Sequence, residues 1–122
     1  VYAASLLVEM VAVTGKKLSE LMEIVNGLCG ERYMEERSYR FAEKDKEPLL
    51  HLLFEEKGLP DLSGYEVERV SYEDGCKVYF ADGSWVSARF SGTEPLLRIF
   101  CEMRTQEEAI GMCNRWKSYL GV

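Results

Sequence analysis

The sequence is short of the residues that build metal sites. Its 122 residues include one histidine, three prolines and four cysteines, none of which forms a C-x-x-C pair. Structural zinc sites need clustered cysteine and histidine ligands, so no zinc site is recognisable and we expect no metal site in this chain. The four cysteines occur in apolar or strand-like surroundings, which predicts that they are buried, reduced thiols: Cys29, Cys76, Cys101 and Cys113.

Positive charge and long apolar runs are also scarce. Lys and Arg number 15 against 21 Asp and Glu, which gives a net charge of −6. Such a balance argues against a general nucleic-acid binder, which needs a basic face. The first apolar stretch, residues 1–13, is too short to span a bilayer and contains Glu9. We therefore expect no nucleic-acid partner, no membrane partner and a cytoplasmic location.

Two helices are predicted at the start of the chain. Apolar residues recur at three- and four-residue spacing in residues 2–13 and 18–28, and no strand precedes them. The chain also begins at Val1 without an initiator methionine. We expect residues 1–30 to be the helical tail of a preceding domain plus a connector, and residues 31–122 to form a C-terminal domain.

The rest of the chain alternates between strand and helix patterns. Asp74-Gly75 and Asp82-Gly83 each separate two alternating runs, a strong hairpin signal because a type I′ turn needs positive φ angles. Thr105 is a predicted N-cap for the closing helix. The predicted order is strand 32–41, helix 43–57, strands 67–72, 76–81 and 84–90, strand 97–103 and helix 106–120. This order predicts an α+β fold, with an antiparallel sheet of four to five strands and two helices on one face.

One segment does not fit a simple hairpin. Residues 89–98 read RFSGTEPLLR and place hydroxyls and a glycine between Arg89 and Arg98. Gly92 opens backbone conformations that other residues avoid, and the amides of such a loop form a concavity for anions. If the polar faces of the flanking strands coincide, the two guanidinium groups converge on one point. Two guanidinium groups beside hydroxyls and amides suit a phosphate dianion.

Less specific interpretations of several residues remain open. The segment could be a polar surface loop whose arginines pair with Glu94 and Glu102. His51 is expected at or near the surface without a catalytic role, because no partner has recognisable spacing. Four aromatic residues could form a platform for RNA bases, but the acidic charge favours a place in the sheet core. These aromatic residues are Tyr65, Tyr72, Tyr79 and Phe80.

Residues 89–102 resemble the phosphate-binding loop of the α-D-phosphohexomutases, of the phosphoglucomutase/phosphomannomutase type. Asp74-Gly75, the run from Asp82 to Trp85 and the helix that begins at Tyr2 are also similar to the last quarter of that family. The resemblance implies that residues 1–15 end the third domain. It further implies that the chain from about residue 31 is the fourth domain, which is TATA-binding-protein-like.

The resemblance also implies roles for individual residues. The non-reacting phosphate of the sugar would be bound by four side chains and one backbone segment: Arg89, Ser91, Thr93 and Arg98 with the Gly92 backbone. Glu94 would shape the loop and support the ligand. Phe90 departs from the family, in which proline or a small residue is frequent. It is expected to point away from the polar face of the loop and to matter little.

The catalytic parts of this family belong to its first three domains. They are a phosphoserine loop, a magnesium loop and a sugar-reading loop, and nothing in this sequence matches them, so no catalytic residue is expected here. The full-length parent would be an isomerase of carbohydrate metabolism. It would interconvert hexose 1- and 6-phosphates by phosphoryl transfer through a bisphosphate, with Mg²⁺. The chain alone would be inactive, and its partners would be a phosphorylated hexose and the upstream domains. The alternative is a non-catalytic module of the same fold that senses phosphosugars or mediates an interaction.

Overall fold

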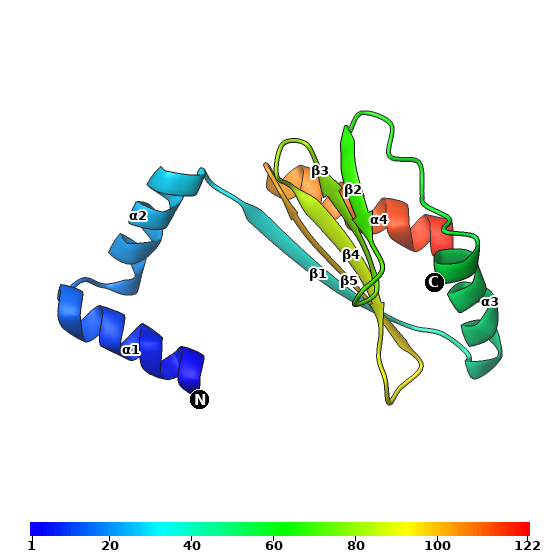
Figure 1. Ribbon diagram of the computed structural model, residues 1–122, viewed down its shortest axis with the longest axis horizontal. Coiled ribbons are helices and arrows are strands. Elements are labelled where there is room, and N and C mark those ends of the chain that lie inside the picture. The colour runs from blue at the N-terminus through cyan, green and yellow to red at the C-terminus, as the bar shows by residue number, and fades with distance from the viewer. The chain divides into compact units, whose positions relative to one another are not determined.

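A computed structural model describes all 122 residues, which divide into two compact units, Val1–Arg32 and Tyr33–Val122. The first unit holds helices α1 (Tyr2–Thr14) and α2 (Leu18–Cys29) (Figure 1). Gly15 ends α1 in the left-handed conformation, and its N–H donates to the carbonyl of Val11 at 2.9 Å. The two predicted helices are therefore confirmed.

The helices of the first unit leave most of their apolar side chains uncovered. Leu21 is their one buried residue. The exposed large apolar side chains of α1 and α2 are Tyr2, Leu6, Leu7, Val8, Met10, Val13, Leu18, Met22, Ile24, Val25 and Leu28. Neither helix, nor any other in the structure, has the length and apolar character needed to cross a membrane. Cys29 is exposed at the end of α2, so the prediction that all four cysteines are buried is wrong for this residue.

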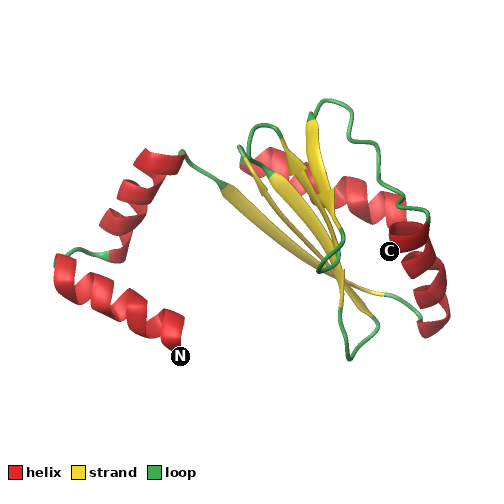
Figure 2. Ribbon diagram, in the orientation of Figure 1, coloured by secondary structure: helices red, strands yellow, loops and turns green.

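The second unit is built on a five-stranded sheet (Figure 2). Its strands are β1 (Tyr33–Arg40), β2 (Val67–Ser71), β3 (Cys76–Phe80), β4 (Trp85–Phe90) and β5 (Leu96–Met103). They lie in the order β1-β5-β4-β3-β2, and each neighbouring pair is antiparallel. The last strand in sequence, β5, thus lies between the first strand and β4. The predicted α+β class is confirmed.

The helical segment after β1 is less regular than the sequence predicts. A 3₁₀ turn, η1 (Glu43–Asp45), leads into α3 (Lys46–Leu50) and then into a π-helical turn, η2 (His51–Glu55). Proline has no backbone N–H, so Pro48 is compatible only with the first turn of the helix. The N–H of Glu56 donates to the carbonyl of His51 at 3.0 Å, five residues back, which widens the last turn.

The closing helix α4 (Gln106–Leu120) begins as predicted. The Thr105 hydroxyl accepts from the Glu108 N–H at 3.2 Å, and the Glu108 carboxylate accepts from the Thr105 N–H at 3.0 Å. This reciprocal pair satisfies two of the donors that a helix start leaves free.

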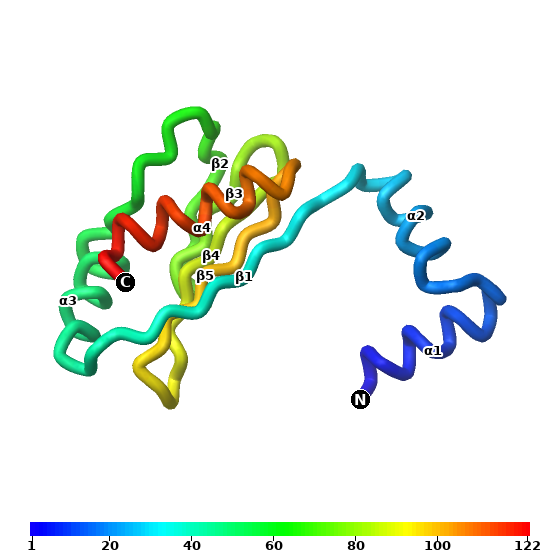
Figure 3. Tube along the Cα trace, turned by 180° about the vertical axis from the view of Figure 1, so that it is seen from behind, coloured from blue at the N-terminus to red at the C-terminus, as the bar shows by residue number.

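The core lies between one face of the sheet and the helices. Helix α4 crosses that face and packs against β1 and β5 (Figure 3). Leu49 and Leu53, from α3 and η2, join the same core, and Trp116 is its largest fully buried side chain. The strand residues that face it are Cys76, Val78, Phe80, Val86, Ala88, Leu97, Ile99, Cys101 and Met103. The alternate residues of β3, β4 and β5 therefore lie on the opposite face, which no helix of this unit covers.

Both predicted hairpins form, but not with type I′ turns. Between β3 and β4, the Gly83 N–H donates to the Phe80 carbonyl and the Phe80 N–H to the Ser84 carbonyl, both at 2.9 Å. Gly83 has a φ of 83°, whereas Asp82 does not have a positive φ. A type I′ turn requires positive φ at both central residues, so that expectation is wrong. Gly75, after β2, also has a φ of 83°.

Candidate functional site

Arg89 and Arg98 lie directly opposite each other in the register of β4 and β5. The β1 partner of Arg98 is Ser38. Both arginines are exposed, and their strand neighbours on the helix side, Ala88 and Ile99, are fully buried. The structure therefore brings the two guanidinium groups to the open face of the sheet, as the alternation of β4 and β5 predicts.

The carboxylates near this pair neutralise only one of the two arginines. Asp74 Oδ1 lies 3.1 Å from Arg89 Nε, and Glu94 Oε1 lies 3.3 Å from Nη2 of Arg40. Arg98 forms no ion pair and no side-chain hydrogen bond. The alternative in which Glu94 and Glu102 pair with Arg89 and Arg98 is therefore wrong. Like charges directly opposite each other destabilise a sheet, so an anion bound between the arginines would relieve this repulsion.

The loop between β4 and β5 presents free hydrogen-bond donors. The Ser91 N–H donates to the Leu96 carbonyl at 2.8 Å, which closes the loop, and the Thr93 N–H donates weakly to Ser91 Oγ at 3.4 Å. The Gly92 N–H and the Thr93 hydroxyl make no hydrogen bond. Gly92 does not have a positive φ, and a Cβ there would meet nothing within 4 Å. Its backbone is thus open to a ligand, although its conformation does not require glycine.

A small hollow lies beside the two arginines. Its volume is about 160 Å³, which is several times the space of one water molecule. It is lined by Arg89, Phe90, Ser91, Gly92, Arg98 and Phe100. Four of the five expected phosphate-binding residues therefore line it, and Thr93 does not.

The base of the loop is anchored on the core by Phe90. Its ring lies 5.7 Å from that of Phe41, edge to face, and 6.2 Å from that of Phe54. The Phe41 N–H donates to the Pro95 carbonyl at 3.2 Å, which ties the far side of the loop to the end of β1. Phe90 therefore has a structural role at the start of the loop.

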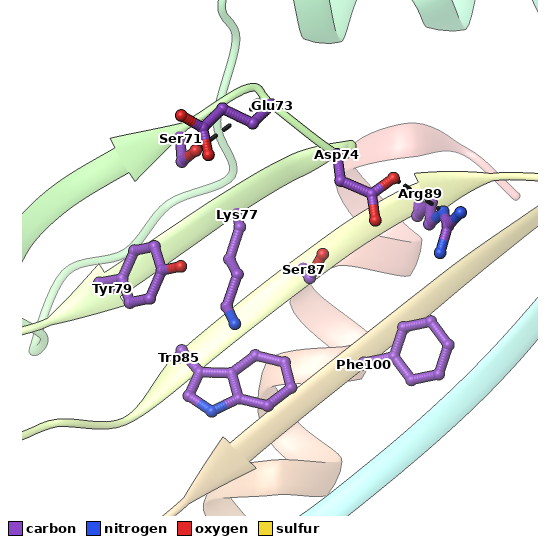
Figure 4. A pocket seen from close by; sticks show the side chains of 9 residues that line it. All are labelled: Ser71, Glu73, Asp74, Lys77, Tyr79, Trp85, Ser87, Arg89 and Phe100. Atoms are coloured by element: carbon purple, nitrogen blue, oxygen red, sulfur yellow. Dashed lines mark hydrogen bonds and ion pairs between the residues drawn. The ribbon is translucent and has the colours of Figure 1, made fainter. Parts of the chain in front are cut away.

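A second hollow of about 320 Å³ adjoins the first on the open face of the sheet (Figure 4). Its lining residues are Ser71, Glu73, Asp74, Lys77, Tyr79, Trp85, Ser87, Arg89 and Phe100. Lys77 Nζ lies 3.9 Å from the Trp85 ring centroid, and the Arg69 guanidinium lies 3.9 Å from that of Tyr79. Tyr79 therefore belongs to this face, and its predicted place in the core is wrong. The other aromatic residues of that prediction, Tyr65, Tyr72 and Phe80, do pack in or against the core.

Asp74 also belongs to this site, and it is not among the residues predicted from the sequence. A signal was present, because counting outward from the Asp82-Gly83 turn pairs Cys76 with Ala88 and brings Gly75 level with Arg89. A Cβ on Gly75 would lie 2.6 Å from the Ala88 carbonyl oxygen. The turn after β2 is therefore seated against β4, and it carries Asp74 to Arg89.

The remaining candidates have no place in this site. His51 is exposed, and its ring nitrogens lie 3.3 Å and 2.9 Å from carboxylate oxygens of Glu55 and Glu56. No group of three or more His, Cys, Asp or Glu side chains in the structure could hold a metal ion.

The family model described as phosphoglucomutase/phosphomannomutase, C-terminal domain, matches residues 40–115, which is more than half of the chain. The chain belongs to this family. The match includes both arginines, the loop between them and Asp74.

Curated relatives agree with this assignment. A phosphoglucomutase/phosphomannomutase of Thermococcus kodakarensis is 36% identical over 103 residues, which are 84% of this chain and 20% of that protein. A probable phosphoglucosamine mutase of Methanosphaera stadtmanae is 34% identical over 91 residues, 75% of this chain and 19% of that protein. A probable phosphoglucosamine mutase of Methanothermobacter thermautotrophicus is 42% identical over 55 residues, 45% of this chain and 12% of that protein. The chain thus spans about a fifth or less of the length of these relatives.

Proposed function

We propose that this chain binds the non-reacting phosphate of a hexose phosphate, as the C-terminal domain of a phosphohexomutase. The observation that carries the proposal is the position of Arg98 directly opposite Arg89 on neighbouring strands, where Arg98 has no anionic partner. A guanidinium group binds phosphate oxygens through two parallel hydrogen bonds, so two guanidinium groups on one face of the sheet suit a phosphate dianion.

The loop supplies the remaining contacts of the proposed site. The Gly92 N–H and the hydroxyls of Ser91 and Thr93 would donate to phosphate oxygens that the arginines leave free. Thr93 lies outside the lining of the hollow, so its contact requires the loop to move towards the ligand. Glu94 is held by Arg40 at 3.3 Å, which supports a role in shaping the loop rather than in touching the phosphate.

In the proposed parent enzyme, these contacts with the non-reacting phosphate lie away from the phosphoryl group that is transferred. The parent would move a phosphoryl group from a phosphoserine to the sugar, and then from the resulting bisphosphate back to the serine. Such a transfer depends on positioning and on charge stabilisation. Binding energy from the remote phosphate would hold the reacting end in place. Mg²⁺ would stabilise the charge of the transferring group, and we assign no residue of this chain to it.

The proposal extends to the organisation and location of the parent. Residues 1–30 would be the tail of a preceding domain plus a connector, and that domain would cover the exposed apolar side chains of α1 and α2. Upstream domains would supply the nucleophile, so the chain alone would have no mutase activity. The enzyme would act in the cytoplasm on a phosphorylated hexose.

The test is an NMR titration of the chain with inorganic phosphate and, separately, with glucose 1-phosphate. We expect backbone amide shifts in residues 91–93 and at Arg98, and their loss in Arg98→Ala. Arg69→Ala is the matched control, because it removes a cation from the same face at the ring of Tyr79 and should keep the shifts. Absence of loop shifts at millimolar phosphate would contradict the proposal.

A further inference from the structure

Asp74 is fixed in place by the backbone around it. It lies in the turn between β2 and β3, and the next residue, Gly75, has a φ of 83°. An added Cβ at Gly75 would lie 3.2 Å from Arg89 Cα as well as 2.6 Å from the Ala88 oxygen. The turn is therefore packed against the backbone at Arg89, and Figure 4 shows the Asp74 carboxylate directed to the Arg89 side chain.

The contact between the two side chains uses one particular edge of the guanidinium. Asp74 Oδ1 lies 3.1 Å from Nε, the nitrogen nearest the aliphatic stem of Arg89. The two terminal nitrogens, Nη1 and Nη2, remain available. A bidentate contact to phosphate needs two adjacent N–H donors, so this edge is the one that an anion in the 160 Å³ hollow can use.

Asp74 makes the one ion pair that orients the Arg89 side chain. Arg89 forms no other ion pair, and Arg98 directly opposite repels it. Arginine loses considerable rotamer freedom when it is ordered, and a site that is ordered before binding avoids that cost. We propose that Asp74 is a positioning residue that orients Arg89 for phosphate, an inference that rests on the function proposed above.

The negative charge of Asp74 would also repel a phosphate ligand, which would weaken binding. The neighbouring residue Glu73 provides a control for this charge effect. Glu73 precedes Asp74 in the same turn and lines the same 320 Å³ hollow, but its carboxylate has no contact with Arg89. Glu73→Gln and Asp74→Asn remove the same charge from adjacent positions. Their difference therefore isolates the contact with Arg89.

The experiment titrates the 122-residue chain with inorganic phosphate in four forms: wild type, Asp74→Asn, Asp74→Glu and Glu73→Gln. The side-chain Nε–H signal of Arg89 is followed together with the loop amides, and it is assigned as the signal missing from Arg89→Lys. We expect phosphate to bind about two- to fivefold more weakly to Asp74→Asn than to Glu73→Gln, the range for an exposed ion pair. In the phosphate-free protein, the Arg89 signal should shift in Asp74→Asn and stay in place in Glu73→Gln. Asp74→Glu should recover part of the affinity.

The outcomes separate this inference from the proposed function. Wild-type protein that shows no response to phosphate overturns both. Wild-type binding with equal affinities of Asp74→Asn and Glu73→Gln, or tighter binding by Asp74→Asn, overturns the positioning role and leaves the proposed function standing. Equal thermal stabilities of the two variants show that a difference in affinity does not come from unfolding.

Discussion

Arg89 and Arg98 face each other across β4 and β5, yet only Arg89 has a carboxylate partner. Arg98 has no carboxylate that would offset its repulsion by the guanidinium of Arg89, and an anion bound at the proposed site would supply the missing negative charge. This relationship leads to the first prediction.

Replacement of Arg98 by alanine should damage function without damaging the fold. In the parent enzyme we expect kcat/KM to fall roughly 10- to 150-fold, which corresponds to a loss of about 1.5–3 kcal/mol, the range for a hydrogen bond to a charged group. The melting temperature of the chain should be unchanged or higher, because the variant removes the repulsion of Arg89. Steady-state kinetics and thermal unfolding measure the two effects, with Arg69→Ala as the control. An unchanged kcat/KM would refute the role of Arg98 in phosphate binding.

Gly75 should tolerate no side chain. Alanine there would have a φ of 83° and a Cβ 2.6 Å from the Ala88 oxygen, so we expect a loss of roughly 2–4 kcal/mol. Gly64 is the matched control, because its φ is 91° and a Cβ there would meet nothing within 4 Å. Gly64→Ala should lose only about 1 kcal/mol. Urea unfolding of both variants measures the difference, and equal losses would show that the contact with β4 is not tight.

The four cysteines should react with thiol reagents in two classes. Cys29 is exposed, whereas Cys76, Cys101 and Cys113 are buried. A thiol reacts only when it is accessible to solvent and ionised to the thiolate. We therefore expect one thiol to react fast in the native protein and the other three to react only after unfolding. The absorbance of the coloured product released by a chromogenic disulfide reagent gives the number of thiols that react in each phase. The fast phase should disappear in Cys29→Ser, and its persistence there would show that a core thiol is accessible.

Stability should decline at alkaline pH, partly through Cys76. Burial raises the pKa of the Cys76 thiol to about 11, above its ordinary value of 9.0. The unfolded chain releases this proton at lower pH than the folded protein does. The stabilisation is therefore complete below the unfolded pKa and is lost as the pH rises towards about 11.

Urea unfolding at pH 8 and pH 10.5 measures this loss, which we expect to be on the order of 1 kcal/mol for Cys76. Cys76→Ala should lose less stability over the interval, and the exposed control Cys29→Ala should lose as much as wild type. Burial also raises the pKa values of four tyrosines, which adds to the decline in all three proteins: Tyr39, Tyr65, Tyr72 and Tyr119. A decline of the same size in Cys76→Ala would contradict the assignment to this thiol.

The sequence predicts the faces of the strands well, because alternation with a period of two is a local property. It places Arg89 and Arg98 away from the core and Ile99 in it, as the structure does. The N-cap at Thr105 is likewise local, since its partner Glu108 lies one helical turn away.

Contacts between different elements were predicted less well. The contact of Asp74 with Arg89 joins the turn after β2 to the end of β4, so it follows only from counting residues outward from the Asp82-Gly83 turn and not from the alternation within one strand. Tyr79 was assigned to the core on composition, although its neighbours Val78 and Phe80 are the residues that face it. The exposure of Cys29 depends on what covers α2, which is again a tertiary property.

The position of β5 between β1 and β4 has a consequence for how the domain folds. Strands β2, β3 and β4 are joined by short turns and can pair as soon as they are synthesised. Strand β1 pairs with β5 alone, in a register that joins Tyr33 to Met103. Pairs so distant in sequence form slowly, because the intervening chain must first be brought together. The docking of β1 on β5 therefore completes the sheet. The hairpin of β4 and β5, whose register places Arg98 opposite Arg89, is local in sequence, so the residues of the proposed anion site can come together before that last step.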